Sequence, residues 1–284
     1  MSESLAKGKD PERPPASGIV QDSRRATEWP DAPPQNVAGH SLANKVAGAQ
    51  EHLSFVAQDG GVVYADLYGE GERGVVLAHG ARSNKESWER QAQVLAKAGF
   101  RVLAIDFRGY GQSRGPEDSD PLSAPLRLDV LAAVRYLWKT GAKSVSVVGA
   151  SMGGGAAADA SIDAKTGEID RLVLLAATAS EPPEKLKGRK LFIVSRDDRQ
   201  GDGVLRLVKI REQYERAPEP KGLLILDGSA HAQFPFATEE GERLMREIVR
   251  FLSQPQDLPS VAQIRSVASH PSVVRCVERR VRKP

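Results

Sequence analysis

The sequence of 284 residues contains one cysteine, Cys276, so no intrachain disulfide can form. Its 40 Lys and Arg against 37 Asp and Glu leave a net charge of +3, too small to indicate a nucleic-acid or membrane-surface partner. No stretch has the roughly eighteen consecutive apolar residues that a membrane span requires, and no basic start followed by an apolar run predicts a signal peptide. These absences favour a cytoplasmic protein without nucleic-acid partners or membrane spans.

Metal and nucleotide motifs are also missing. The five histidines are scattered along the chain, and the single cysteine lies near its end, so no set of metal ligands is predicted. Gly153-Gly154-Gly155 belongs to no GxGxxG pattern and has no Lys-Ser or Lys-Thr after it, which argues against a bound nucleotide. We therefore expect no metal and no cofactor.

Composition divides the chain into three parts. Residues 1–50 are rich in Pro, Ser and Ala without a hydrophobic period, which indicates a disordered or loosely attached extension; alternatively Trp29 anchors it to the domain. Residues 51–253 form the predicted domain. Residues 254–284 are polar and end in a basic run, which we interpret as a solvated tail, with a short docked helix over 261–268 as the alternative.

Strand and helix patterns alternate through the predicted domain. A hairpin around Asp59-Gly60-Gly61 comes first, and helices and buried strands follow it in turn. Strands are expected over residues 53–57, 62–68, 75–78, 100–105, 144–148, 172–175, 191–194 and 223–226, and helices over 86–98, 126–138, 204–214 and 239–252. This order predicts an α/β fold with a doubly wound, mostly parallel sheet of about eight strands and an N-terminal hairpin.

Ser151 stands between Gly149 and Gly153, directly after a β-branched strand and before a run of small residues suited to a tightly packed helix. A serine in such a strand-to-helix turn is typical of a nucleophile elbow, in which the strained backbone lifts the hydroxyl above the sheet. Glycine is expected on both sides because side chains there would collide in so sharp a turn.

A serine hydroxyl needs a base, and His231 is the candidate. It follows the last predicted strand, where the histidine of a serine triad stands in this chain order. The other four histidines occupy the extension, the first strand, the end of the third strand and the tail: His40, His52, His79 and His270.

The base needs an acid that orients it, and the strand over residues 191–194 is followed by two. Asp198 is favoured over Asp197, and Glu181 after the preceding strand is a weaker substitute.

Two backbone amides are expected to stabilise a developing oxyanion. One belongs to Met152, at the start of the helix after the elbow, and the other to Ala81, in the loop after the third strand. Gly80 is expected to let that loop approach the serine closely.

With these motifs in place, residues 50–253 resemble the α/β-hydrolase family. The resemblance depends on His79-Gly80, the Asp106-Phe-Arg-Gly-Tyr-Gly-Gln-Ser113 turn, the elbow, the acid and the histidine. It implies that Ser151 is the nucleophile, His231 the base and Asp198 the acid, with the Ala81 and Met152 amides as the oxyanion hole.

Two departures from the family pattern bear on the site. The acid strand of relatives often ends in Gly-x-x-Asp, whereas this chain has Ser195 at the first position. Residues 176–190 are too few for the helical cap that many relatives insert there, so no large cap domain is expected. We expect an open site, shielded by residues 82–84 and 111–125, as in uncapped dienelactone-hydrolase-like and thioesterase-like enzymes that take small or surface-presented acyl groups.

The sequence therefore predicts a serine hydrolase that cleaves a carboxylic ester or thioester of a small-molecule or acyl-bearing substrate through an acyl-enzyme. Amidase or peptidase activity and perhydrolysis use the same triad and stay open. Epoxide hydrolases and dehalogenases normally have aspartate at the elbow, so Ser151 argues against both. The alternative from another class is a non-catalytic binding protein on this fold.

Overall fold

The computed structural model describes residues 50–116 and 125–255. The extension expected over residues 1–50 and the tail expected over 254–284 lie almost entirely outside these ranges, as do Trp29 and Cys276, so both remain predictions.

Eight strands form one sheet in the order β1-β2-β4-β3-β5-β6-β7-β8. The first two form an antiparallel hairpin, β2 is antiparallel to β4, and every other neighbouring pair is parallel. The strands are β1 (Glu51–Val56), β2 (Val62–Tyr68), β3 (Arg73–Ala78), β4 (Phe100–Ile105), β5 (Ser144–Ala150), β6 (Arg171–Leu175), β7 (Arg189–Ser195) and β8 (Lys221–Leu226). The predicted mostly parallel sheet with an N-terminal hairpin is confirmed.

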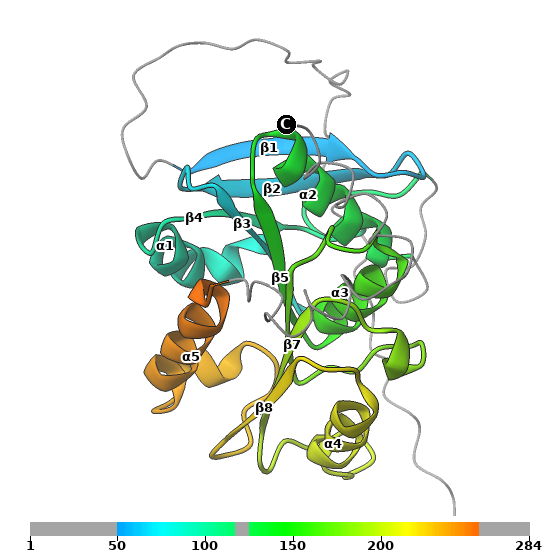
Figure 1. Ribbon diagram of the computed structural model, residues 1–284, viewed down its shortest axis with the longest axis vertical. Coiled ribbons are helices and arrows are strands. Elements are labelled where there is room, and N and C mark those ends of the chain that lie inside the picture. Colours follow the sequence, from blue (N-terminus) through cyan, green and yellow to red (C-terminus); the bar gives the residue numbers. More distant parts are fainter. Residues whose placement is uncertain (1–49, 117–124, 256–284) are drawn as a thin grey trace, which may run out of the picture. The chain divides into compact units, whose positions relative to one another are not determined.

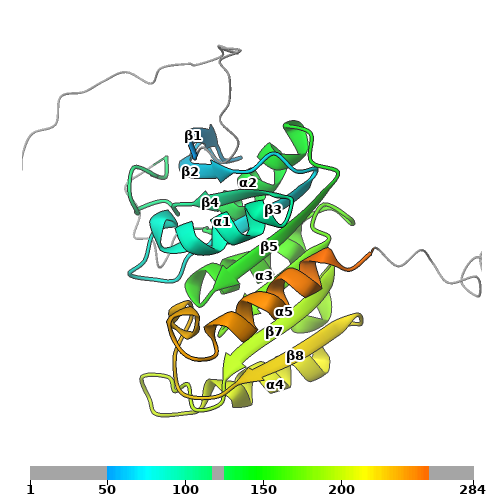
Figure 2. The same cartoon turned by 90° about the vertical axis from the view of Figure 1, so that its left-hand side faces the viewer.

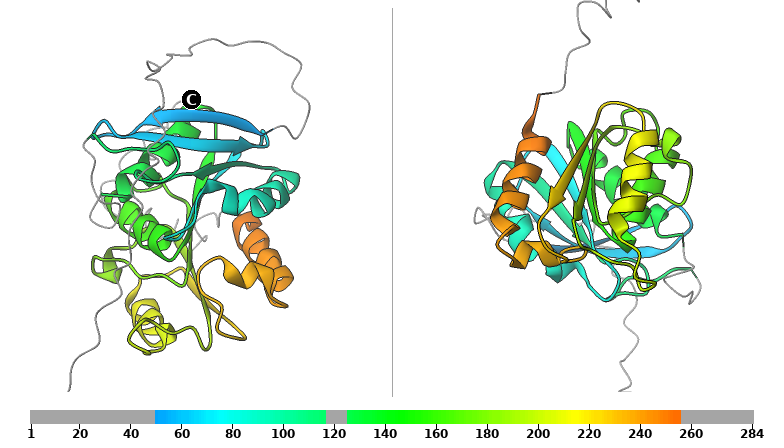
Figure 3. Two further views of the ribbon diagram at one scale, coloured as in Figure 1. Left: turned by 180° about the vertical axis from the view of Figure 1, so that it is seen from behind. Right: turned by 90° about the horizontal axis from the view of Figure 1, so that it is seen from below.

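Helices cover both faces of this sheet (Figure 1). One face carries α1 (Glu89–Lys97) and α5 (Gly241–Ser253), and the other carries α2 (Arg127–Lys139), α3 (Met152–Asp163) and α4 (Arg206–Arg216). Figure 2 shows α1 and α5 side by side over the strands, and the right-hand view of Figure 3 places α5 and α4 on opposite sides of the sheet. Parallel strands end at the same edge, so the loops after them meet there.

The two apolar layers of the core follow from the alternation of side chains along a strand. On β5, Val145 and Val147 pack against the α2, α3 and α4 face, whereas Val148 and Ala150 pack against the α1 and α5 face. All four are buried, which explains why the central strands are apolar at nearly every position.

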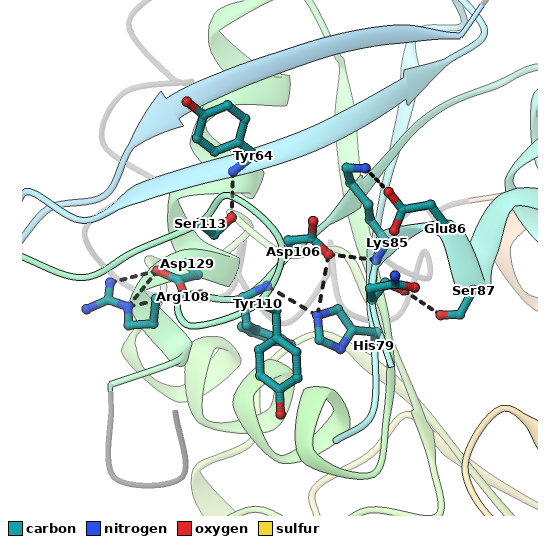
Figure 4. A network of polar contacts seen from close by, with 12 residues as sticks. Tyr64, His79, Lys85, Glu86, Ser87, Asp106, Arg108, Tyr110, Ser113 and Asp129 are labelled. Atoms are coloured by element: carbon teal, nitrogen blue, oxygen red, sulfur yellow. Dashed lines mark hydrogen bonds and ion pairs between the residues drawn. The ribbon is translucent and has the colours of Figure 1, made fainter. Parts of the chain in front are cut away.

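The Asp-x-Arg-Gly-x-Gly-x-Ser turn after β4 ties the hairpin to α2 (Figure 4). The buried Arg108 guanidinium pairs with Asp129 Oδ1 of α2 at 2.6 Å and with Asp59 Oδ2 of the hairpin turn at 2.5 Å. Ser113 Oγ accepts the Tyr64 N–H of β2 at 2.8 Å. The role of the turn is therefore structural: it joins β2, the hairpin turn and α2.

Two local features refine the expected elements. The helix expected over residues 86–98 begins with a separate 3₁₀ turn, η1 (Lys85–Trp88), before α1. The connection from β6 to β7 contains a single 3₁₀ turn, η2 (Pro183–Lys185), and no cap domain. Within the described ranges, no helix is long and apolar enough to cross a membrane.

Candidate active site

Ser151 occupies a strained turn between β5 and α3. Its φ of 49° and ψ of −114° lie in a region that residues with a side chain rarely adopt. A Cβ on Gly149 would lie 2.4 Å from the Gly153 carbonyl oxygen, and one on Gly153 would lie 2.4 Å from the carbonyl oxygens of Ala78 and His79. The turn therefore requires glycine on both sides of Ser151.

Three side chains from separate strand ends meet at this turn. His231 Nε2 lies 2.8 Å from Ser151 Oγ, and His231 Nδ1 lies 2.7 Å from Asp198 Oδ2. Asp198 is buried, with 2% of its side chain exposed, while His231 is 29% exposed and half-buried Ser151 borders an open cavity. The hydroxyl can therefore donate to Nε2, while Nδ1–H donates to the carboxylate.

The structure distinguishes among the three candidate acids. Asp197 is exposed, and its N–H donates to the Gly228 carbonyl. Glu181 is half exposed, and its carboxylate pairs with Lys185 at 3.0 Å. Asp198 alone of the three contacts His231.

Arg206, at the start of α4, is a neighbour of this group that the sequence analysis missed. Its Nε lies 3.3 Å from Asp198 Oδ1, and its N–H donates to the Asp198 carbonyl at 2.8 Å. No motif marks it, because it reaches the acid only when α4 folds back against the end of β7. The two oxygens of the Asp198 carboxylate therefore have different partners, one His231 and the other Arg206.

The loop after β3 lies against the start of α3. This contact follows from the close approach of Gly153 to the Ala78 and His79 carbonyls. Met152 is the first residue of α3, where a backbone N–H has no acceptor within the helix. The two amides expected to form the oxyanion hole, those of Met152 and Ala81, therefore belong to adjacent segments.

The space around Gly80 differs from what was expected for a glycine that allows the loop to approach the serine. A Cβ there would meet its nearest neighbours, the Ala150 carbonyl oxygen and Gln233 Oε1, at 3.5 Å, which is ordinary contact. Its φ is not in the left-handed region. Close approach to the serine therefore does not require glycine at this position.

His79 holds the carbonyl side of this loop. The ring is buried, its Nδ1–H donates to the Gly80 carbonyl at 2.8 Å, and its Nε2 accepts the Phe107 N–H at 3.3 Å (Figure 4). Burial lowers the pKa of His79 to about 4, so the ring is neutral near pH 7. Nearby, burial raises the pKa of Asp106, whose Oδ1 accepts the Lys85 N–H at 2.8 Å.

A cavity of about 770 Å³ opens beside Ser151, over α3, α4 and the loop after β6. Its charged lining residues are Arg127, Asp159, Asp163, Glu181, Lys185, Arg206 and Lys209. Arg127 pairs with Asp163 at 2.6 Å, so part of this charge is neutralised within the walls. The expected shield over residues 82–84 does not line this cavity, and residues 117–124 of the other expected shield lie outside the described ranges.

Across residues 50–116 and 125–255, no group of three or more His, Cys, Asp or Glu side chains is arranged to hold a metal ion.

Comparisons with known proteins agree with this architecture. A family model described as the alpha/beta hydrolase fold matches residues 74–209. Bifunctional epoxide hydrolase 2 of Sus scrofa is 40% identical over 82 residues, which are 28% of this chain and 14% of that protein. The chain spans less than half the length of the curated relatives it matches.

Many solved structures share the fold, and two of them serve as examples. The esterase Pf2001 of Pyrococcus furiosus aligns with a TM-score of 0.61 at 20% identity, over 72% of this chain and 92% of that one. A dienelactone hydrolase of Anabaena variabilis aligns with a TM-score of 0.58 at 20% identity, over 72% and 97%. At these identities the likeness concerns the fold alone.

Proposed function

We propose that this chain, which belongs to the α/β-hydrolase fold family, is a serine hydrolase that cleaves a carboxylic ester or thioester through an acyl-enzyme. The observation that carries the proposal is the continuous hydrogen-bonded path from Ser151 Oγ through His231 to buried Asp198, at 2.8 and 2.7 Å. Nucleophilic catalysis by serine requires this arrangement of nucleophile, base and orienting acid.

In the first half of the reaction, Ser151 Oγ attacks the substrate carbonyl carbon while its proton passes to His231 Nε2. Asp198 stabilises the resulting imidazolium through Nδ1–H and holds the ring in the required tautomer. The carbonyl oxygen becomes an oxyanion, for which the Met152 and Ala81 amides are the candidate donors. The proton on Nε2 then goes to the leaving alkoxide or thiolate, and the acyl group stays on Ser151.

In the second half, a water molecule replaces the leaving group. His231 takes a proton from this water, the hydroxide oxygen attacks the acyl carbon, and the proton on Nε2 returns to Ser151 Oγ as the acid departs. The same two nitrogens of His231 serve both halves, which is consistent with its partial exposure beside an open cavity.

The identity of the residue at the elbow supports acyl transfer over epoxide opening, although several relatives are named epoxide hydrolases. Ser151 stands where epoxide hydrolases normally carry an aspartate, and its hydroxyl has a base within hydrogen-bonding distance. The absence of a cap between β6 and β7 supports small acyl groups or acyl groups presented by a larger carrier.

Labelling with a fluorophosphonate probe tests the proposal, because the probe reports an activated serine without the right substrate. The purified wild type and the Ser151→Ala, His231→Ala and Ser180→Ala variants are compared, with short-chain p-nitrophenyl esters and thioesters assayed in parallel. Ser180 lines the same cavity as Ser151 and is the matched control. We expect labelling and turnover in the wild type and the Ser180→Ala variant and neither in the other two.

Circular dichroism and thermal melting establish that each variant is folded. A folded wild type that neither labels nor turns over these esters would contradict the proposal and favour the non-catalytic binding protein. Labelling that persists in Ser151→Ala would assign the reactive serine to another position.

A further inference from the structure

Gln233 connects the loop that carries His231 to the loop that carries Ala81. Its Oε1 accepts the Gly80 N–H at 2.9 Å, across 153 residues of sequence. Its Nε2 donates to Ser87 Oγ at 2.7 Å, and Ser87 Oγ donates in turn to the Asn84 carbonyl. Because the amide nitrogen of Gln233 donates to Ser87 Oγ, its amide oxygen is the end that faces Gly80. This orientation suits Gly80, whose N–H requires an acceptor.

Ala232, the residue between His231 and Gln233, has a strained backbone conformation. Its φ is 56°, in the left-handed region that favours glycine, and the residue is buried with 8% exposure. This conformation separates the directions of its two neighbours, so that His231 points to Ser151 while Gln233 points to Gly80. Strain of this kind persists only where the surrounding contacts determine it, and it concentrates at functional sites.

Gly80 is held by hydrogen bonds on both of its peptide groups. Gln233 binds its N–H, and His79 Nδ1–H binds its carbonyl oxygen at 2.8 Å. That carbonyl shares a planar trans peptide with the Ala81 N–H, and in such a peptide the two groups point in opposite directions. The bond to His79 therefore aims the Ala81 N–H away from the His79 ring. Since no steric contact constrains Gly80, these two bonds set the orientation of the loop.

We propose that Gln233 is a positioning residue for the oxyanion hole, which it serves by holding the Gly80 amide so that the next amide, that of Ala81, faces the reacting carbonyl. This inference rests on the proposed serine hydrolase function. Gln233 does not touch the reacting atoms, and its effect passes through Gly80. Within residues 50–116 and 125–255, the Gln233 amide hydrogen-bonds to Gly80 and Ser87 and to no triad side chain, so the base and the acid do not depend on it.

The test compares Gln233→Leu, which removes both bonds, with Gln233→Glu, which keeps an oxygen acceptor for Gly80. Gln93→Leu is the matched control, because Gln93 lies on α1 and hydrogen-bonds at the surface with Glu89. Loss of one oxyanion donor lowers kcat by about 10²–10³-fold, so a misoriented donor is expected to cost about 10–100-fold. We expect Gln233→Leu to lower kcat by this factor on a p-nitrophenyl ester, with KM within about threefold of wild type.

Two further readouts separate positioning from a general structural role. The affinity for a trifluoromethyl ketone, which forms a tetrahedral adduct with an activated serine, falls by the same factor as kcat in Gln233→Leu. The midpoint of the acid limb of the kcat/KM pH profile does not move, because His231 keeps both partners. Gln233→Glu recovers kcat to within about fivefold of wild type, and Gln93→Leu matches the wild type.

A Gln233→Leu variant with unchanged kcat and ketone affinity would overturn the inference. So would a shift of the acid limb, which would mean that Gln233 acts through His231, or a Gln233→Glu variant as impaired as Gln233→Leu. A wild type without ester turnover would refute the proposed function and this inference with it. That failure is seen in the wild type alone, whereas failure of this inference by itself is seen only in the variants.

Discussion

Ser195 donates its hydroxyl hydrogen to the carbonyl oxygen of Ala230 at 2.6 Å, so the end of β7 is joined to the residue before His231. Ser195 is the position at which relatives often have glycine, and its side chain supplies a link between β7 and the loop that carries His231, which glycine could not form. The departure from the family pattern therefore has a structural consequence within the site.

Removal of this link by Ser195→Ala is expected to lower kcat several-fold and the free energy of unfolding by about 1 kcal/mol, because one buried hydrogen bond is lost. Ester turnover and urea unfolding measure the two effects. Ser54→Ala, on the exposed side of β1, is the control and should change neither. A Ser195→Ala variant with wild-type kcat would show that the base loop holds its position without this bond.

The adjacent residues Asp197 and Asp198 offer a matched pair of substitutions. Asp198→Asn is expected to lower kcat by about 10³–10⁴-fold, because the amide can no longer hold the correct tautomer of His231 or stabilise its cation. Asp197→Asn should stay within about twofold, because Asp197 is exposed and does not contact His231. Steady-state kinetics on one ester distinguishes them, and equal effects would contradict the assignment of Asp198.

Gly153 and Gly80 lie on either side of the expected oxyanion hole but differ in the space around them. A Cβ on Gly153 would lie 2.4 Å from two backbone oxygens that cannot move aside, so Gly153→Ala should unfold the protein or lower its melting temperature by more than about 10 °C. Gly80→Ala should change the free energy of unfolding by less than about 1 kcal/mol, since its nearest neighbours would be at 3.5 Å. Differential scanning calorimetry measures both, and a normal melting temperature for Gly153→Ala would contradict the geometry of the elbow.

The buried ring of His79 predicts a dependence of stability on pH. Its pKa is about 4 in the folded protein and near 6.5 when the chain is unfolded, so the unfolded state binds the proton first as the pH falls. The contribution of neutral His79 to the free energy of unfolding is therefore fully present above about pH 6.5. As the pH approaches 4, the free energy of unfolding falls by up to about 3 kcal/mol because of this group. Urea unfolding of the wild type at several pH values in this window measures the loss.

The His79→Gln variant isolates the contribution of the ring to this pH dependence. Its free energy of unfolding should fall less steeply between about pH 6.5 and pH 4, whatever its absolute stability, because glutamine does not titrate. Parallel curves for the two proteins would show that His79 does not supply the difference. Buried Asp106 has a raised pKa and contributes with the opposite sign in both proteins.

The strands and the mostly parallel sheet with its N-terminal hairpin could be predicted from the sequence because each buried strand is a short β-branched or aliphatic run bounded by turns. Ser151 and His231 could be located as candidates because each follows such a run, and parallel strands deliver their loops to one edge. Asp197 and Asp198 stand side by side, so the choice between them depends on burial, which appears only when β7 pairs with β8.

Other features depend on contacts between side chains far apart in sequence and leave no local pattern. Gln233 meets Gly80 across 153 residues, and Arg206 reaches Asp198 only because α4 turns back on β7. The expected need for glycine at residue 80 was wrong for a related reason, since the space around a Cβ is set by residues 150 and 233 rather than by neighbours in the chain.

The position of β8 at the edge of the sheet has a consequence for biosynthesis. Ser151 leaves the ribosome 80 residues ahead of His231, and the base follows the strand that docks onto β7 at this edge. On the proposed mechanism, a nascent chain therefore carries its serine without its base while these 80 residues are made, and cannot form an acyl-enzyme in that interval. During refolding, the return of probe labelling reports the docking of this last strand, so it should lag behind the recovery of helical signal.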